Sequence, residues 1–137
     1  SQDLQFEKKK LSKKKILEMY QKKTGRLFEF SFSAPFILGN KTNYQIRFAK
    51  DFGLLFGLIF QIVDDLIDQI GTLDKIGKTP GKDFKQGKST LLNILGKKNA
   101  IYYCENEIKI FKAKYKDFMK KNIILEEILF YGLKRII

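Results

Sequence analysis

A long apolar run with helical spacing, from Tyr44 to Ile70, does most to constrain the fold of this chain. Phe52, Phe56 and Phe60 recur at intervals of four, so they share one stripe of a helix and supply its packing surface. With 137 residues, the chain is long enough for one domain with a real core. We therefore expect this run to be the central helix of a single folded region.

Apolar spacing also predicts a helix before this run. From Ser12 to about Leu38 apolar residues recur at three, four and seven positions, with Ser12 as a plausible N-cap. The alternating phenylalanines of 28–32 are also compatible with a strand, and Pro35 should kink or end a helix. A helix is the favoured interpretation of this segment.

Turn and cap residues divide the rest of the chain. Gly39-Asn40 predicts a turn, after which Thr42 or Asn43 caps the central helix. Residues 71–87 have the composition of a functional loop, with four glycines, a proline and several charges. Further helices are expected at about 90–120, with a break near Gly96, and at 125–136. The predicted fold class is all-α.

The net charge of +12 comes mostly from lysines, which are spread over the whole chain. Only three residues are arginine, whereas proteins that read bases use arginine for bidentate contacts. We therefore expect no nucleic-acid partner, although lysines give a general attraction for anions.

The longest apolar run, 52–63, is too short to span a bilayer, and no signal peptide is evident, so we expect a cytoplasmic protein without a membrane span. The single cysteine, Cys104, is expected to pack in the core.

Three aspartates interrupt the apolar run near its end. At 100° per residue, a helix places them and one glutamine within an arc of about 100°. This face consists of Gln61, Asp64, Asp65 and Asp68. Gly53 and Gly57 lie on or beside the same stripe, so another group could approach the helix closely there.

Like charges on one helix face repel one another and need a positive partner. Salt bridges to surface lysines are one explanation. The other is a divalent metal, since Mg²⁺ prefers oxygen ligands and is often held by one or two carboxylates together with substrate phosphate oxygens. The loop that follows favours the metal, because Lys78 and Lys88 stand beside glycines and Asp83 lies between them. Carboxylates with nearby lysines are typical of a diphosphate site.

These motifs, in this order, resemble the C-terminal half of a trans-isoprenyl diphosphate synthase, of the polyprenyl synthetase family. The bacterial farnesyl diphosphate synthases, or geranyltranstransferases, are most similar. The resemblance rests on Lys23-Thr24-Gly25, on Phe60 to Asp68 (FQIVDDLID), on Gly77-Lys78, on Asp83 and on Gly87-Lys88-Ser89-Thr90. It implies an isoprenoid-synthase-type helical bundle.

The resemblance also implies roles for individual residues. Asp64, Asp65 and Asp68 would anchor Mg²⁺, for which Mn²⁺ could substitute, and Asp64 would do so most directly. The remaining residues would act on the substrates. Lys23 would bind the diphosphate, Thr24 and Gln61 would lie beside the allylic group, Lys78 would hold the leaving pyrophosphate, and Lys88 would be a further basic residue of that region.

The implied reaction is a head-to-tail condensation of dimethylallyl or geranyl diphosphate with isopentenyl diphosphate, giving farnesyl diphosphate and pyrophosphate. Members of the family are about twice as long and carry a first aspartate-rich motif, which is absent from residues 1–137. We therefore expect 1–137 to be the C-terminal half of a larger, homodimeric synthase, inactive by itself. The alternative is a non-catalytic helical regulatory or binding module that retains the motif.

Overall fold

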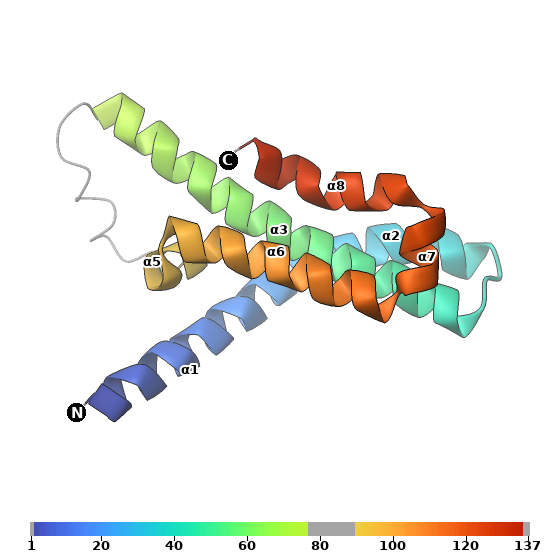
Figure 1. Cartoon of the computed structure of the whole chain (residues 1–137), viewed down its shortest axis with the longest axis horizontal. Helices are drawn as coiled ribbons and strands as arrows, with labels where there is room; N and C mark the ends of the chain where they lie inside the picture. Colours follow the sequence, from blue (N-terminus) through green and yellow to red (C-terminus); the bar gives the residue numbers. More distant parts are fainter. Residues whose placement is uncertain (1, 77–89, 136–137) are drawn as a thin grey trace.

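The computed structural model describes residues 2–76 and 90–135, and in these ranges it is built from helices without strands (Figure 1). The predicted all-α class is confirmed. The helices are α1 (Gln2–Tyr20), the π-helical turn η1 (Gln21–Gly25), α2 (Arg26–Leu38), α3 (Asn43–Ile76), α5 (Leu91–Leu95), α6 (Lys97–Lys114), α7 (Lys116–Lys121) and α8 (Ile123–Lys134).

The predicted first helix is present but is longer and interrupted. It begins at Gln2, so Ser12 lies inside α1 and the prediction of Ser12 as an N-cap is wrong. The phenylalanines of 28–32 are helical, which excludes the strand alternative. Pro35 lies in the last turn of α2, which ends at Leu38, close to where the proline was expected to end it.

The central helix is α3, and it is capped as predicted. Thr42 Oγ1 accepts the backbone N–H of Gln45, and Gln45 Oε1 accepts the backbone N–H of Thr42. This reciprocal pair satisfies two donors that would otherwise have no partner at the helix start. The helix passes through Gly71 and ends at Ile76, six residues beyond its predicted end, and the rest of the predicted loop lies outside the described residues. None of the described helices is long and apolar enough to cross a membrane.

Glycines let the first helical segment lie directly on α3. A Cβ atom at Gly53 would lie 2.7 Å from the carbonyl carbon of Phe28 in α2, and one at Gly57 would lie 3.1 Å from the Cα of Gly25. Real Cβ atoms are essentially never found as close to backbone atoms as at Gly53, so that position has no room for a side chain, and the contact at Gly57 is tighter than most. The close approach expected at these glycines therefore occurs, and the approaching group is the chain's own backbone.

Aromatic side chains fill the space beside this contact. The predicted stripe packs on α2, with the Phe28 and Phe56 rings 4.9 Å apart and the Phe32 and Phe52 rings 5.0 Å apart. On another side of α3, Phe48 stacks on Phe118 of α7 at 4.4 Å. The aromatic packing expected from the spacing of four is confirmed, and aromatic contacts join α3 to α2 and to α7.

The C-terminal helices cover the other side of α3 (Figure 1). Thr90 caps α5 by accepting the N–H of Asn93, and Gly96 ends that helix with a φ of 80°, as the predicted break required. A second break at Tyr115 was not predicted. The last helix begins at Ile123, two residues before the predicted start.

Cys104 is fully buried in the core, as expected for a packing residue. Burial, with smaller effects of Glu107 and Glu105, raises its pKa to about 12. At pH 8 the thiolate fraction is then on the order of one in ten thousand, and the thiolate is the reactive form. We expect negligible labelling of the folded protein by dithionitrobenzoate and complete labelling in urea. Rapid labelling without denaturant would contradict this burial.

Candidate functional site

A chain of hydrogen bonds connects the two motifs that the sequence singled out. Thr24 Oγ1 in η1 donates to Gln61 Oε1 in α3 at 2.9 Å. Gln61 Nε2 donates to Asp65 Oδ1, one turn further along α3, at 3.1 Å. Asp65 Oδ2 accepts the hydroxyl of Tyr20 at 2.5 Å. Residues 37 and 45 positions apart in the sequence are thus brought together beside the aspartate motif.

The environment of Asp65 shows opposing electrostatic effects. Burial raises the pKa of its carboxyl group, the hydrogen bonds from Tyr20 and Gln61 lower it, and the charges of Asp64 and Asp68 raise it, with a net shift upwards. The carboxylate is satisfied by a tyrosine and a glutamine, and no lysine pairs with it among the described residues. The salt-bridge explanation of the motif therefore does not apply to Asp65.

Asp64 and Asp68 differ from Asp65, because both are exposed. Asp64 makes no hydrogen bond or ion pair with the residues that the structure describes. Lys23, the residue before Thr24, is exposed as well. Hard carboxylate oxygens at an accessible helix edge are suited to a metal, and the exposed ammonium group of Lys23, next to Thr24 in η1, is suited to a diphosphate.

The three aspartate carboxylates of the motif can supply some, but not all, of the ligands that Mg²⁺ needs. No three His, Cys, Asp or Glu side chains in 2–71 and 90–135 gather closely enough to hold a metal by themselves. Mg²⁺ commonly takes one or two protein carboxylates and completes its coordination with water and phosphate oxygens. Asp64 and Asp68 can supply such ligands, whereas both oxygens of Asp65 already accept hydrogen bonds.

Two predicted substrate residues, Lys78 and Lys88, lie outside the described residues, as does Asp83. The site described above therefore consists of residues from η1 and α3, with Tyr20 from the end of α1.

Sequence spacing did not reveal the π-helical turn that places Lys23 and Thr24. The buried positions Tyr20 and Gly25 are five apart, where an α-helix repeats at three or four. A π-turn contains one extra residue, and such turns are frequent at functional sites. Burial is a property of the folded chain, so the sequence alone carried no signal for this turn. Tyr20 is one of the regularly spaced apolar residues of 12–38, and nothing in that spacing indicates the role of its hydroxyl.

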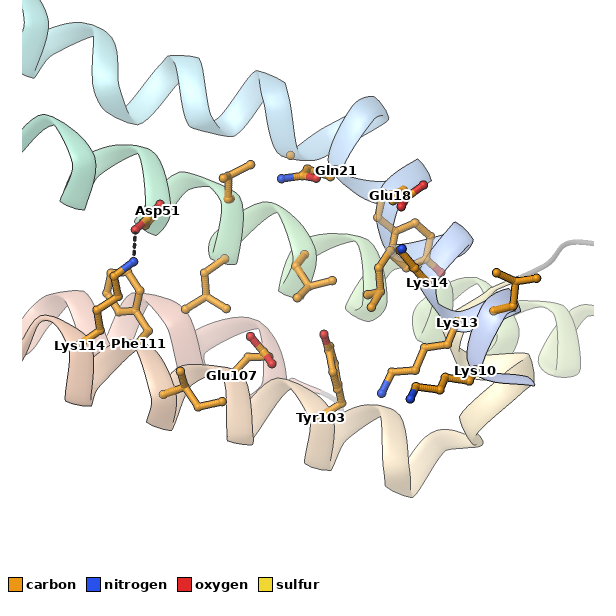
Figure 2. Close-up of a pocket in the computed structure, with 18 of the residues that line it drawn as sticks. Lys10, Lys13, Lys14, Glu18, Gln21, Asp51, Tyr103, Glu107, Phe111 and Lys114 are labelled. Carbon is orange, nitrogen blue, oxygen red and sulfur yellow. Dashed lines mark hydrogen bonds and ion pairs between the residues drawn. The ribbon is translucent and has the colours of Figure 1, made fainter. Parts of the chain in front are cut away.

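A groove of about 1030 Å³ lies between α1, α3 and α6 (Figure 2). Its floor is apolar, with Leu54, Leu55 and Leu58 of α3, and its rim is charged. Lys13 of α1 reaches across it to lie 4.5 Å from the ring centre of Tyr103. None of the predicted site residues that the structure describes lines this groove, although Tyr20, whose hydroxyl bonds Asp65, does.

Comparisons with known proteins agree with the motifs. The chain is 34% identical over 92 residues to a short chain isoprenyl diphosphate synthase of Methanocaldococcus jannaschii, covering 67% of this chain and 28% of that protein. It is 32% identical over 121 residues to a dimethylallyltranstransferase of Fischerella ambigua, covering 85% of this chain and 34% of that protein.

The chain therefore spans about a third of the length of these relatives. No solved structure matches it. The family model described as polyprenyl synthetase matches residues 1–128, almost the whole chain. This chain belongs to the polyprenyl synthetase family.

Proposed function

We propose that this chain forms one wall of the active site of a Mg²⁺-dependent prenyltransferase. The reaction joins an allylic diphosphate to isopentenyl diphosphate and releases one pyrophosphate in each round, so farnesyl diphosphate forms from geranyl diphosphate in one round or from dimethylallyl diphosphate in two. The observation that carries the proposal is the hydrogen-bonded chain from Thr24 through Gln61 to Asp65, which lies next to the exposed carboxylate of Asp64.

The leaving diphosphate is held at the exposed edge of this wall. Asp64 and Asp68 would hold Mg²⁺, which when bound neutralises charge on the diphosphate oxygens. Lys23 from η1 adds a further positive charge, and Lys78 and Lys88 are proposed to act from the following segment. Fixed positive groups favour a reaction in which negative charge collects on the leaving group, since they need no rearrangement as it ionises.

The carbon part of the substrate is placed by the polar chain. When the allylic C–O bond breaks, the electron pair leaves with pyrophosphate and an allylic cation remains. The oxygens of Thr24 and Gln61 are proposed to stabilise that cation. The alkene of isopentenyl diphosphate then forms the new C–C bond, and loss of a proton restores a double bond. Phe60, half-exposed on the turn before Asp64, provides apolar surface that excludes water.

Metal removal tests the proposed function. The complete protein is incubated with labelled isopentenyl diphosphate and each allylic diphosphate, and products are identified after hydrolysis to alcohols. We expect prenyl transfer that stops with EDTA and returns with Mg²⁺ or Mn²⁺, and negligible transfer by residues 1–137 alone.

Other results would favour other assignments. Activity that persists in EDTA would contradict the metal role. Absence of both transfer and calorimetric binding of magnesium pyrophosphate would favour a non-catalytic helical module. The identity of the main product would decide whether farnesyl diphosphate is correct, and sedimentation of the complete protein would test the predicted homodimer.

A further inference from the structure

Tyr20 occupies a position that its role as a core residue does not explain. Its side chain is only 4% exposed, and its ring belongs to the core shared by α1 and α3. Its hydroxyl oxygen lies 2.5 Å from Asp65 Oδ2 and 3.0 Å from the backbone nitrogen of Leu91, the first residue of α5. One buried oxygen atom thus connects three helices at the aspartate motif.

Each hydrogen bond of this network can be assigned one donor and one acceptor without conflict. The N–H of Leu91 donates to the hydroxyl of Tyr20, which must then donate its own hydrogen to Asp65. Asp65 accepts a second hydrogen bond from Gln61. Because the Gln61 amide donates through nitrogen, its oxygen remains to accept from Thr24. The orientation of Gln61 at the substrate side is therefore linked to Tyr20 through Asp65.

We propose that Tyr20 is a positioning residue for prenyl transfer. It holds Asp65 as the fixed centre of the network, so that Asp65 orients Gln61 and Thr24 while the exposed Asp64 and Asp68 face the metal. This proposal rests on the proposed function and assigns a role to a residue outside the motifs. Residues that orient the groups around a metal site commonly affect activity about 10- to 100-fold when they are changed.

The chain offers a closely matched control in Tyr115. Its side chain is 1% exposed, and its hydroxyl donates to a carboxylate, Asp51, also at 2.5 Å. Asp51 lies in α3 and Tyr115 lies at the break between α6 and α7, and neither belongs to the network at the aspartate motif. Tyr20→Phe and Tyr115→Phe each delete a part-buried hydrogen bond to a carboxylate and keep the aromatic ring, and Tyr20→Phe also removes the acceptor of the Leu91 N–H. Only the first deletion should affect the site.

Steady-state kinetics of the complete protein provide the main test. For Tyr20→Phe we expect kcat to fall about tenfold or more, because Gln61 is less well oriented when the cation forms. The KM for isopentenyl diphosphate should not change, since that substrate does not depend on Gln61. Tyr115→Phe should leave both constants unchanged. In an Asp65→Asn background Tyr20→Phe should add little, because residues of one network do not act additively.

Amide hydrogen exchange gives a readout that does not depend on turnover. Tyr20→Phe should speed exchange at Leu91, whose N–H loses its acceptor, whereas Tyr115→Phe should not. If the wild-type protein is active and the Tyr20→Phe variant has the same kcat, the positioning role is refuted and the proposed function is unaffected. Equal losses of kcat in both variants would also overturn it, because they would indicate a general effect of stability. A complete wild-type protein without prenyl transfer would refute the proposed function, and the positioning role with it.

Discussion

Replacing Asp64 with alanine is expected to lower kcat/KM for prenyl transfer by about 100- to 1000-fold in the complete protein. Asp64 is exposed, makes no hydrogen bond or ion pair with the described residues, and stands at the end of the apolar face that carries Phe60. The variant removes a carboxylate from the proposed metal-binding edge, so the diphosphate would be less well neutralised as it leaves. Calorimetry should show a parallel loss of magnesium pyrophosphate binding.

The same variant should not lose stability. Asp64 lies near Asp65 and Asp68, and its charge contributes to raising the pKa of Asp65. Removing one of three like charges relieves repulsion, so the melting temperature should stay the same or rise slightly. Glu127→Gln, an exposed carboxylate on α8, provides the control and should leave turnover unchanged. Undiminished turnover in Asp64→Ala would refute the role assigned to this residue.

The second large effect is expected on protein stability, at the close contact between α2 and α3. Gly53→Ala is expected to destabilise the protein by about 3 kcal/mol, the upper part of the usual range for overpacking. The added methyl group would meet the backbone of Phe28 and Glu29 in α2, which cannot turn aside as a flexible side chain would. To accommodate it, α2 and α3 must separate, and this also draws Thr24 away from Gln61.

Gly71→Ala is the matched control, in the same helix but with no heavy atom within 4 Å of the new Cβ. There the substitution should stabilise the protein by up to about 1 kcal/mol, because alanine is the better helix former. Urea denaturation of both variants, compared by their midpoints at equal m-values, separates these effects. Equal midpoints for Gly53→Ala and Gly71→Ala would show that the contact between α2 and α3 is not as close as described.

Much of the secondary structure could be predicted because it depends on local spacing and on caps. The turn at Gly39-Asn40, the cap at Thr42 and the break at Gly96 are all present. Errors occurred where local signals are weak. Helix α3 continues through Gly71, where helix cooperativity outweighs the low helix propensity of one glycine.

The candidate site was predictable to a different extent. The face shared by Gln61 and the three aspartates follows from helix geometry alone, whereas the contact of Gln61 with Thr24 joins residues 37 positions apart and is known only from the structure. The difference in burial and hydrogen bonding among the three aspartates was not predictable from the sequence. Asp65 is half-buried and holds two hydrogen bonds, whereas Asp64 and Asp68 are exposed, and this difference arises from where α1 and η1 cross α3.

The amino-acid sequence by itself determined that this protein is helical, that three aspartates share a face of one helix, and that its motifs are those of the polyprenyl synthetase family. The tertiary structure decided which backbone lies on Gly53 and Gly57, that a π-turn carries Lys23 and Thr24, and that the hydroxyl of Tyr20 completes the network at Asp65. Helical periodicity is a local property of the chain and can be counted along it. Contacts between residues 37 and 45 positions apart depend on how the helices cross, which only their packing fixes.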